Sequence, residues 1–420
     1  MKIDYIACLA NAATIASALS SNVVSVPYEY TYLLPTFTED VAGTFVNATK
    51  TTDDSINEIL ASAAKAPFIS YDNEFLSILG SNPTLELVEE RNLEFAFEAA
   101  VWVPERNEVF FTSSVLDAAN GIPGHFEVLN LNTKKISNLT TSKPVILPNG
   151  GDYHNGLVYL TTSRSLNATK ADYNGGIVSI NPATGEVQQI LNSYFGLQFS
   201  DIDDIAWTTQ SSTGKSYMYF TTFPIVHALS PAAAPMGLAN AVWRWDPQEK
   251  IILPMLSRLD VTFPDGVRVS PDQRYLYVTD FTGDRWSALL GVAAQVGSPA
   301  VYRYDLDAEM RPTNRQFFGY PRRGGADGIH VDDQGRVWTA EGDGVVVRRA
   351  DGKILGVFNA LVFGNPGLIP IANFALAGDV LVILGGYRIF TVQLGQIVNK
   401  QKSFGKPPSG KRWLLGNLFQ

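Results

Sequence analysis

One pattern recurs six times along this chain and constrains its fold more than any other feature: a polar residue, a short apolar strand, a turn and a second apolar strand. In the clearest copy, residues 263–280, apolar and polar residues alternate after Asp265, residues 270–274 predict a turn, and residues 275–279 restart the strand pattern. Alone, Asp265 beside a glycine would be an ordinary turn former. Repetition favours a shared role. The other copies lie at residues 97–112, 148–161, 201–221, 325–339 and 371–383.

The spacing of these polar residues predicts a β-propeller. They are separated by roughly 46 to 62 residues, about the length of one blade with its loops. A second hairpin follows each copy, most clearly at residues 176–190, and completes a four-stranded blade. We therefore predict an all-β chain, a six-bladed β-propeller with a short N-terminal arm. Because the first strand of each blade lines the central channel, the six polar residues should converge on the axis: Glu98, Asn149, Asp203, Asp265, Asp327 and Asn373.

Composition agrees with this fold and restricts the partners. The chain has 420 residues, 45% of them apolar and 17% charged, enough to bury a large core, and its 35 Gly and 23 Pro fit many short strands joined by turns. A net charge of −9 argues against nucleic acid, which needs a basic face. No stretch is long and apolar enough for a membrane span. We expect a small-molecule substrate; the oligomeric state is not indicated.

The sequence predicts four segments, two of them at the ends of the chain. Residues 1–25 read as a secretory signal peptide, the alternative being a disordered or short helical N-terminus. Residues 26–67 predict an N-terminal arm, residues 68–400 the propeller, with a strand before residue 88 closing the ring, and residues 401–420 a tail. Secretion would place the protein in the secretory lumen or outside the cell. It would also allow N-glycosylation at three sequons, Asn47, Asn138 and Asn167.

Several segments together resemble the fungal lactonohydrolases of the regucalcin, gluconolactonase and paraoxonase superfamily. They are residues 97–102, 147–151, 194–199, 263–267, 275–280 and 326–331. The resemblance runs from about residue 69 to residue 398, and its ordered blade motifs are specific for the fold and less specific for activity.

The resemblance implies a divalent metal on the propeller axis, most often Ca²⁺. Carried over by position, its ligands would be Glu98, Asp203, Asp265 and Asp327. Two departures stand out: Asp203 and Asp265 occupy positions where the family has asparagine. A third is Thr222, which stands where the family has an aspartate. Both carboxylate and amide oxygens suit hard cations.

Four carboxylates around one dication leave excess negative charge, whose repulsion costs several kcal/mol at an intermediate dielectric. Three responses are open: protonation of one or two carboxyls, tighter metal binding, or abandonment of the metal.

Residue roles follow from the resemblance. Asp327 or a neighbouring carboxylate with a raised pKa, such as Asp265, would act catalytically as general base. Asn149 would hold substrate, although a turn role remains open to it, and Asp204 is either a substrate contact or a structural carboxylate. Loop aromatics are further candidates for substrate binding at the channel mouth: Tyr153, Phe195 and Phe223.

Two functions of different classes fit these residues. The first is a metal-assisted lactonase acting on a small secondary-metabolite or sugar lactone. The second is a non-hydrolytic biosynthetic cyclase of the hetero-Diels–Alderase type, using the same funnel with or without metal. A binding propeller without chemistry is less favoured because converging carboxyls are costly to maintain. The fold itself does not choose among them.

Overall fold

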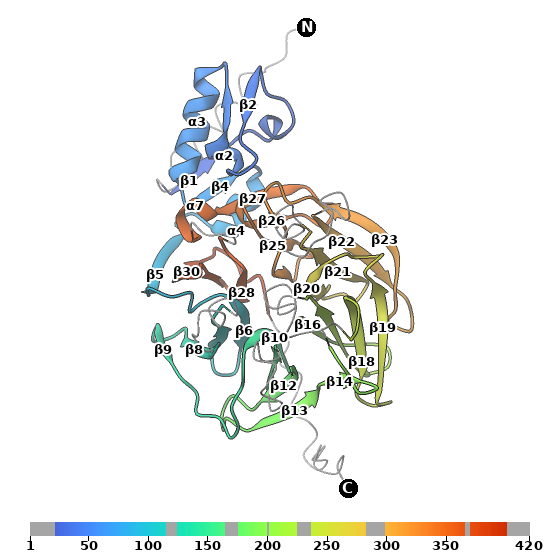
Figure 1. Cartoon of the computed structure of the whole chain (residues 1–420). Coiled ribbons are helices and arrows are strands. Elements are labelled where there is room, and N and C mark those ends of the chain that lie inside the picture. Colours follow the sequence, from blue (N-terminus) through green and yellow to red (C-terminus); the bar gives the residue numbers. More distant parts are fainter. Residues whose placement is uncertain are drawn as a thin grey trace.

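The computed structural model describes residues 22–114, 124–163, 175–199, 201–224, 237–282, 299–365 and 370–400. Strands dominate them and form six sheets of four or six strands around one axis, which confirms the predicted six-bladed propeller (Figure 1). Most of the predicted signal peptide, the tail at 401–420 and the sequon at Asn167 lie outside the described residues.

Each blade is an antiparallel sheet whose strands follow the chain from the axis outward, apart from the closing strands described below. Blade 1 contains β6 (Glu98–Val103), β7 (Glu108–Thr112), β8 (Phe126–Asn130) and β9 (Lys135–Ser137). Blade 2 contains β10 (Pro148–His154), β11 (Leu157–Thr162), β12 (Gly176–Ile180) and β13 (Val187–Leu191). Blade 3 contains β16 (Ile202–Thr209), β17 (Ser216–Thr222), β18 (Ala241–Asp246) and β19 (Ile251–Ser257). A small hairpin of β14 (Ser193–Tyr194) and β15 (Leu197–Gln198) precedes blade 3.

The second half of the ring is built in the same way. Blade 4 contains β20 (Pro264–Val269), β21 (Tyr275–Asp280), β22 (Ala300–Leu306) and β23 (Pro312–Gly319). Blade 5 contains β24 (Ile329–Val331), β25 (Val337–Glu341), β26 (Gly344–Arg348) and β27 (Ile354–Asn359), followed by α7 (Ala360–Phe363). Blade 6 contains β28 (Asn373–Ala377), β29 (Val380–Leu384) and β30 (Arg388–Gln393).

The ring is closed by a strand from the N-terminal side. β5 (Thr84–Glu90) pairs antiparallel with β30, with Leu87 opposite Phe390, and becomes the outermost strand of blade 6. This confirms the closing strand expected from the sequence. Joining the two ends of the chain in one sheet covers an edge that would otherwise expose unpaired backbone groups.

The hydrophobic core is divided among the junctions between blades. One cluster of buried side chains lies between each pair of neighbouring blades; that between blades 1 and 2, for example, joins Val101 and Phe110 to Val158 and Leu160. The largest lies between blades 5 and 6, where Trp338 is fully buried and where α4 (Asn73–Leu79) also packs. Because each blade packs on two neighbours, the ring holds its innermost strands rigidly around the axis.

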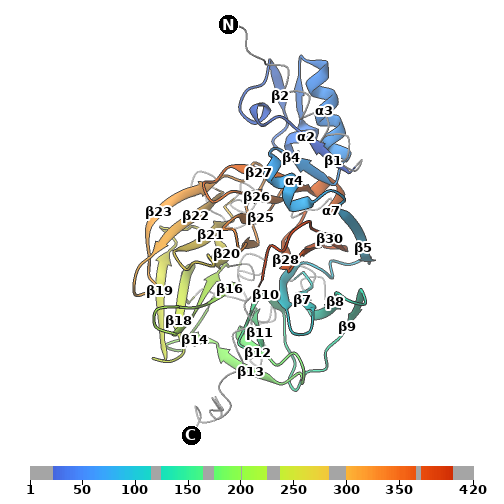
Figure 2. The same ribbon diagram turned by 180° about the vertical axis from the view of Figure 1, so that it is seen from behind.

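Residues 26–67, which we call the N-terminal unit, project from the outer side of blade 5 (Figures 1 and 2). They contain η1 (Tyr28–Thr31), β2 (Phe37–Glu39), α2 (Phe45–Ala48), β3 (Thr49–Thr51) and α3 (Asp54–Lys65), with β2 paired to β3. The side chain of Asp53 caps α3, whose buried face includes Ile56 and Leu60. On either side of the unit, β1 (Val23–Ser25) and β4 (Phe68–Ser70) pair in parallel and extend blade 5 to six strands.

Of the helices in the described ranges, none has the length and apolar character needed to cross a membrane.

Candidate functional site

The six polar residues singled out by the repeat all lie at the start of the first strand of their blades. Glu98 and Asn373 are the first residues of β6 and β28, while Asn149, Asp203 and Asp265 are the second residues of β10, β16 and β20. Asp327 lies two residues before β24. All six are buried, between 2% and 8% exposed. They therefore gather at one end of the central channel, and we call them the axial cluster.

A β-bulge at the same place in four blades turns these side chains toward the axis. The register of β6 shifts between Glu98 and Val101, and equivalent shifts occur in β10, β16 and β20. In β6 the bulge is made by Ala99 and Ala100, whose φ angles of 69° and 54° lie in the left-handed region. Such angles are strained in alanine, and bulges and strain of this kind are common beside functional sites.

Threonines that the sequence reasoning missed hold the blades together at this level. The hydroxyl of Thr112 donates to the carbonyl of Asn149 at 3.0 Å, so blade 1 is bonded to blade 2 directly behind an axial residue. The pattern repeats at the next three junctions, with Thr161 bonded to Asp203, Thr221 to Asp265 and Thr279 to Asp327. A threonine near the end of the second strand of blades 1 to 4 was the signal in the sequence. These bonds fix the backbone that carries the axial side chains.

The first strands also approach one another closely. A Cβ atom on Gly150 would lie 2.2 Å from the carbonyl oxygen of Asp203, and one on Gly266 would lie 2.5 Å from that of Asp327. Glycine after the axial residue is therefore required by contact with the neighbouring blade.

Replacing Gly150 with alanine should lower the free energy of unfolding by about 2 kcal/mol, as overpacking does in rigid cores. The measurement is urea unfolding followed by tryptophan fluorescence. The matched control is Gly237→Ala, where the nearest atoms would lie 3.7 Å from the new Cβ. Equal stabilities of the two variants would contradict the close approach.

The axial cluster is organised as two groups of three. In the first, the amide of Asn149 donates to Asp203 Oδ1 at 2.6 Å, and the carboxyl of Asp265 is hydrogen-bonded to Asp203. In the second, the amide of Asn373 donates to Glu98 Oε2 at 2.8 Å, and the carboxyl of Asp327 is hydrogen-bonded to Glu98. A carboxyl-to-carboxyl hydrogen bond requires a proton on one partner. Each group can therefore hold one proton between its two carboxyls, beside one amide.

Burial explains why these acids keep protons. It raises the pKa of Glu98 to about 8, with the negative charge of Asp203 adding to the effect. Burial, followed by the charges of Asp203 and Asp327, holds the pKa of Asp265 well above its usual range. The pKa of Asp327 is raised in the same way by burial and by Glu98. Opposed carboxyl pairs that share protons near neutral pH can supply both an acid and a base.

The axial cluster fits a metal ion in its chemistry but not in its arrangement. Carboxylate oxygens are donors that hard cations accept. As placed, however, the carboxyls bond to one another, and no three His, Cys, Asp or Glu side chains in the described ranges are grouped so as to hold an ion.

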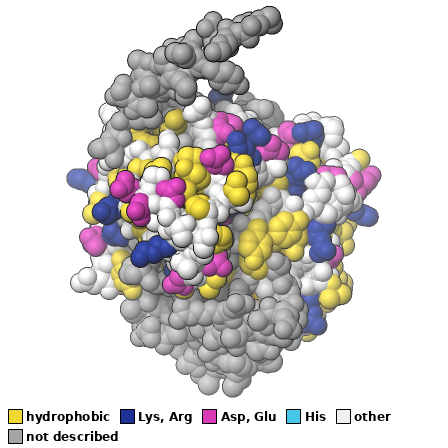
Figure 3. All heavy atoms as spheres, turned by 90° about the horizontal axis from the view of Figure 1, so that it is seen from above, with side chains coloured by type: hydrophobic (Ala, Val, Ile, Leu, Met, Phe, Trp, Pro, Cys, Tyr) yellow, Lys and Arg dark blue, Asp and Glu magenta, His cyan; other side chains and the backbone are white. Residues whose placement is uncertain are grey.

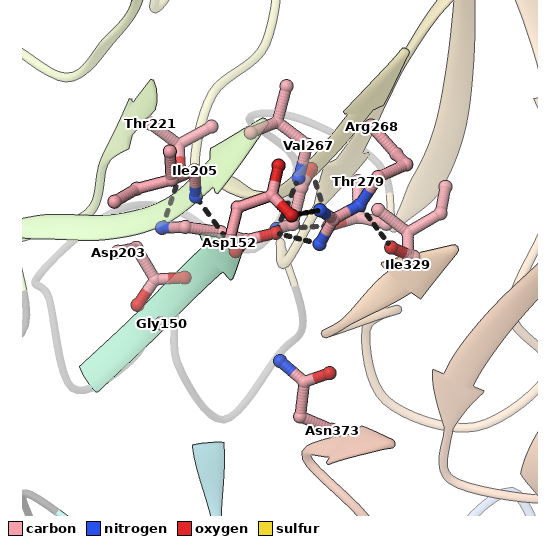
Figure 4. A network of polar contacts seen from close by, with 12 residues as sticks. Gly150, Asp152, Asp203, Ile205, Thr221, Val267, Arg268, Thr279, Ile329 and Asn373 are labelled. Atoms are coloured by element: carbon pink, nitrogen blue, oxygen red, sulfur yellow. Dashed lines mark hydrogen bonds and ion pairs between the residues drawn. The ribbon is translucent and has the colours of Figure 1, made fainter. Parts of the chain in front are cut away.

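Arg268 balances part of the negative charge beside the axial cluster. Arg268 of β20 lies 3.5 Å from Asp204 Oδ2 and 3.4 Å from Asp152 Oδ1 of β10. Its Nε donates to the carbonyl of Ile329 at 3.1 Å. Figure 4 shows the guanidinium of Arg268 facing the carboxylate of Asp152, with Ile329 on its other side. Arg268 therefore links blades 2, 3, 4 and 5 around the channel.

The other residues predicted to bind substrate lie in different parts of the structure. Asp204 accepts hydrogen bonds from the backbone of Ile205 and Val267, so its carboxylate joins β16 to β20. Tyr153 lies four residues beyond Asn149 along β10 and donates its hydroxyl to Glu105 at 2.7 Å, so the structure does not bring it to the axial cluster. Phe223 follows β17 and packs edge-on to Phe263, beside the strand that carries Asp265. Phe195, between β14 and β15, is 91% exposed.

The described histidines outside the loops are structural. His330 is partly buried and packs edge-on against Phe374, with 5.0 Å between the ring centroids. His154 is buried and stacks on Trp207 at 4.5 Å, and burial lowers the pKa of His154 to about 4.

The pKa of His154 predicts an acid-sensitive contribution to stability. The unfolded chain binds this proton below about pH 6.5 and the folded chain only below about pH 4, so stability falls as the pH drops through that window. The axial carboxyls act in the opposite direction because their folded pKa values are raised. The test is therefore the difference in the free energy of unfolding between wild type and His154→Gln, measured by urea titration. This difference should shrink by about 2 kcal/mol from pH 7 to pH 4.5. A difference independent of pH would contradict a neutral buried His154.

Comparisons with known proteins agree with this geometry. The model of the family described as SMP-30/Gluconolactonase/LRE-like region matches residues 98–362, from the first axial residue to α7. A lactonohydrolase, oryL, of Aspergillus oryzae is 25% identical over 300 residues, covering 66% of this chain and 64% of the relative. A gluconolactonase of Zymomonas mobilis is 26% identical over 227 residues, covering 52% of this chain and 57% of the relative. This chain thus spans less than two thirds of each of these curated relatives.

Solved structures show the same fold. A gluconolactonase from Xanthomonas campestris superimposes with a TM-score of 0.59 at 18% identity, covering 78% of this chain and 95% of that one. A calcium-binding regucalcin from Agrobacterium tumefaciens gives a TM-score of 0.51 at 14% identity, covering 76% and 95%. Together with the family match, these findings confirm the resemblance drawn from the blade motifs.

Proposed function

Because the chain belongs to the SMP-30/gluconolactonase/LRE-like family, we propose that it is an enzyme that hydrolyses lactones at the axial cluster. The observation that carries the proposal is the pairing of four buried carboxyls from four blades, with Asp265 on Asp203 and Asp327 on Glu98. The curated relatives named lactonohydrolase and gluconolactonase support the reaction class.

Lactone hydrolysis requires a base for water and an acid for the oxygen atoms of the substrate, and the two groups of the cluster supply both. The proton shared by Asp327 and Glu98 moves onto Glu98, and Asp327 takes a proton from the attacking water. The carboxylic acid of Asp265 donates a hydrogen bond to the lactone carbonyl and stabilises the oxyanion. When the ring C–O bond breaks, Asp327 returns its proton to the departing alkoxide oxygen. The product is the hydroxy acid, and Asn149 and Asn373 keep the two carboxylates oriented.

The surroundings of Asp265 favour a substrate with apolar character. Phe223, Phe263 and Phe281 form edge-on contacts at the start of β20, and all three are buried. We therefore propose a small, partly apolar lactone of the secondary-metabolite type in preference to a sugar lactone.

The direct test measures acid release by pH-stat from glucono-δ-lactone and δ-decalactone, corrected for hydrolysis in buffer. Turnover of δ-decalactone well above that of glucono-δ-lactone would support both the reaction and the apolar preference. Faster turnover of the sugar lactone would keep the reaction and overturn the preference. No turnover of either, with or without added Ca²⁺, would contradict hydrolysis and favour the cyclase alternative.

We also propose Ca²⁺ as a cofactor held by Glu98, Asp203, Asp265 and Asp327. The calcium-binding regucalcin relative and the oxygen-rich donor set support this proposal. To bind there, the ion would have to displace the protons that the carboxyl pairs share. When bound, the ion would supply the stabilisation of the oxyanion that the Asp265 proton supplies in the paired arrangement.

Proton release tests the cofactor without any substrate. Calorimetric titration with Ca²⁺ in two buffers of different ionisation enthalpy should show about two protons released per ion at pH 7, because metal ligands must be deprotonated. Asp265→Ala should abolish both binding and proton release. Failure of the wild type to bind Ca²⁺, together with no stoichiometric metal by elemental analysis, would contradict the metal site and leave the carboxyl mechanism standing.

We also propose that the protein is secreted and N-glycosylated. Asn47 and Asn138 are exposed, as acceptor sites must be. Expression in a fungal host with analysis of the medium, before and after treatment with a glycosidase specific for N-linked glycans, tests both. Intracellular protein of unchanged mass would contradict them.

A further inference from the structure

A cavity lies outside the propeller ring, between the N-terminal unit and the outer half of blade 5. Its volume is about 400 Å³, and it is bounded by η1, β2 and α2 on one side and by β26, β27 and β4 on the other. In the sheet order of blade 5, β27 is separated from the axial strand β24 by β26 and β25. At about 4.8 Å per strand, the cavity is well removed from the axial cluster. We call it the outer pocket.

Part of the wall contributed by the sheet is apolar, and Glu341, Arg348 and Asn359 line the rest of it. Val346 of β26, Val357 of β27 and Ile69 of β4 line it and belong to the hydrophobic cluster that also holds α3. These side chains lie on the face of blade 5 opposite to Val345 and Val347, which pack toward blade 6. The floor of the outer pocket is therefore fixed by the core of the protein and is formed before any ligand binds.

The wall contributed by the N-terminal unit is aromatic and partly exposed. Tyr32, which follows η1, is 73% exposed, and Phe37 of β2 is 49% exposed, yet both line the pocket. Figure 3 looks onto the end of the molecule that carries the N-terminal unit, where hydrophobic side chains form patches between acidic and basic groups. Aromatic rings held at the rim of a preformed cavity are typical of sites for small apolar ligands.

One end of the pocket is polar. Asp343 Oδ1 accepts a hydrogen bond from the backbone of Phe45 at 3.0 Å, and Arg322 donates through one Nη to the carbonyl of Gly43. In the described part of the chain, Asp343 Oδ2 and the second Nη of Arg322 have no hydrogen-bond partner. The pocket thus offers one acceptor and one donor of opposite charge, both bonded to the backbone of residues 43–45. A neutral hydroxyl group can donate to the first and accept from the second, whereas an anion or a cation would be repelled by one of them.

We propose that the outer pocket binds a small neutral aromatic molecule bearing a hydroxyl group. The aromatic body would lie between Val346 and Val357 on one side and Tyr32 and Phe37 on the other, with the hydroxyl at Asp343 and Arg322. This ligand site is separate from the axial cluster and does not depend on lactone hydrolysis.

The probe for this site is 2-naphthol, titrated into the full-length protein by calorimetry, beside naphthalene and 2-naphthalenesulfonate. We expect saturable 1:1 binding of 2-naphthol, at least tenfold tighter than that of naphthalene because its hydroxyl gains hydrogen bonds to Asp343 and Arg322, and weaker binding of the sulfonate. Binding should be unchanged in Asp327→Asn, which excludes the axial cluster as the site. No saturable binding up to the solubility of 2-naphthol, or tighter binding of the sulfonate, would overturn the proposal.

Matched variants locate the site. Tyr32→Ala and Phe37→Ala should each weaken 2-naphthol binding at least fivefold, because each removes an aromatic wall. Leu33→Ala and Val41→Ala are the controls: these side chains are 67% and 77% exposed and are not part of the pocket wall. All four changes are at exposed positions, so folding should be preserved. Equal losses in the two sets of variants would contradict a site in the outer pocket.

Discussion

Replacing Asp327 with asparagine is expected to lower kcat for lactone hydrolysis by about 10³-fold, the usual contribution of a positioned general base. Asparagine keeps the size of the side chain but cannot take a proton from water. It can still donate to Glu98, so the geometry of the second group should be preserved. Because the change removes a buried acid whose pKa burial raises, the free energy of unfolding should not fall.

The measurement is steady-state hydrolysis by wild type and Asp327→Asn, with unfolding curves for both. Asp351→Asn serves as control, because its carboxylate is exposed and bonds to Arg349 and to the backbone of Lys353 on the surface. A loss in kcat of less than tenfold in a folded Asp327→Asn protein would remove Asp327 from the role of base.

Replacing Arg268 with methionine is expected to lower the free energy of unfolding by about 3 to 5 kcal/mol, as removal of one partner of a buried ion pair does. Arg268 is the cation that contacts both Asp152 and Asp204, and burial already raises the pKa of Asp204 to about 7. Without it, these carboxyls would have to take up protons or remain charged without a counterion. The lost bond to Ile329 would also loosen blade 4 from blade 5.

Urea unfolding of Arg268→Met beside Arg274→Met checks this. Arg274 lies on the same hairpin, is 69% exposed and pairs with Asp272, so its loss should cost less than about 0.5 kcal/mol. Adding Asp204→Asn to Arg268→Met should restore part of the lost stability, because the two side chains interact directly. Similar losses in the two single arginine variants, or no recovery in the double variant, would contradict the role of Arg268.

The sequence predicted the propeller because its repeat combines two independent periodicities. Alternation within each strand identified the hairpins, and the blade-length spacing of the polar residues identified their arrangement around an axis. Burial of Glu98, Asn149 and Asp265 at one end of the channel follows from that symmetry alone. The closing strand β5 was predictable because an open ring would leave unpaired strand edges.

The internal structure of the site was not predictable in the same way. The pairing of Asp265 with Asp203 and of Asp327 with Glu98 depends on bulges, which shift side chains by one position without a clear sequence signal. The assignment of Tyr153 to the channel mouth rested on its place in a loop-like stretch. β10 instead continues through Tyr153 to His154, which carries that ring toward the far end of the hairpin.

The N-terminal unit was the least predictable region. Its strands β2 and β3 are three residues long and mostly polar, so they lack the alternation by which longer strands are recognised. They form because α2 and α3 pack around them on blade 5, a tertiary effect that local sequence does not carry.

The central claim is that the axial cluster adds water to a lactone carbonyl, and oxygen isotope incorporation tests it most directly. The best substrate of the lactone panel would be incubated with the wild-type enzyme in H₂¹⁸O, and the product analysed by mass spectrometry after subtraction of buffer hydrolysis. The account predicts a hydroxy acid with one ¹⁸O in its carboxyl group, formed at a rate that falls sharply in Asp327→Asn. A product of the same mass as the substrate, without ¹⁸O, would contradict hydrolysis and identify the reaction as a rearrangement or cyclisation.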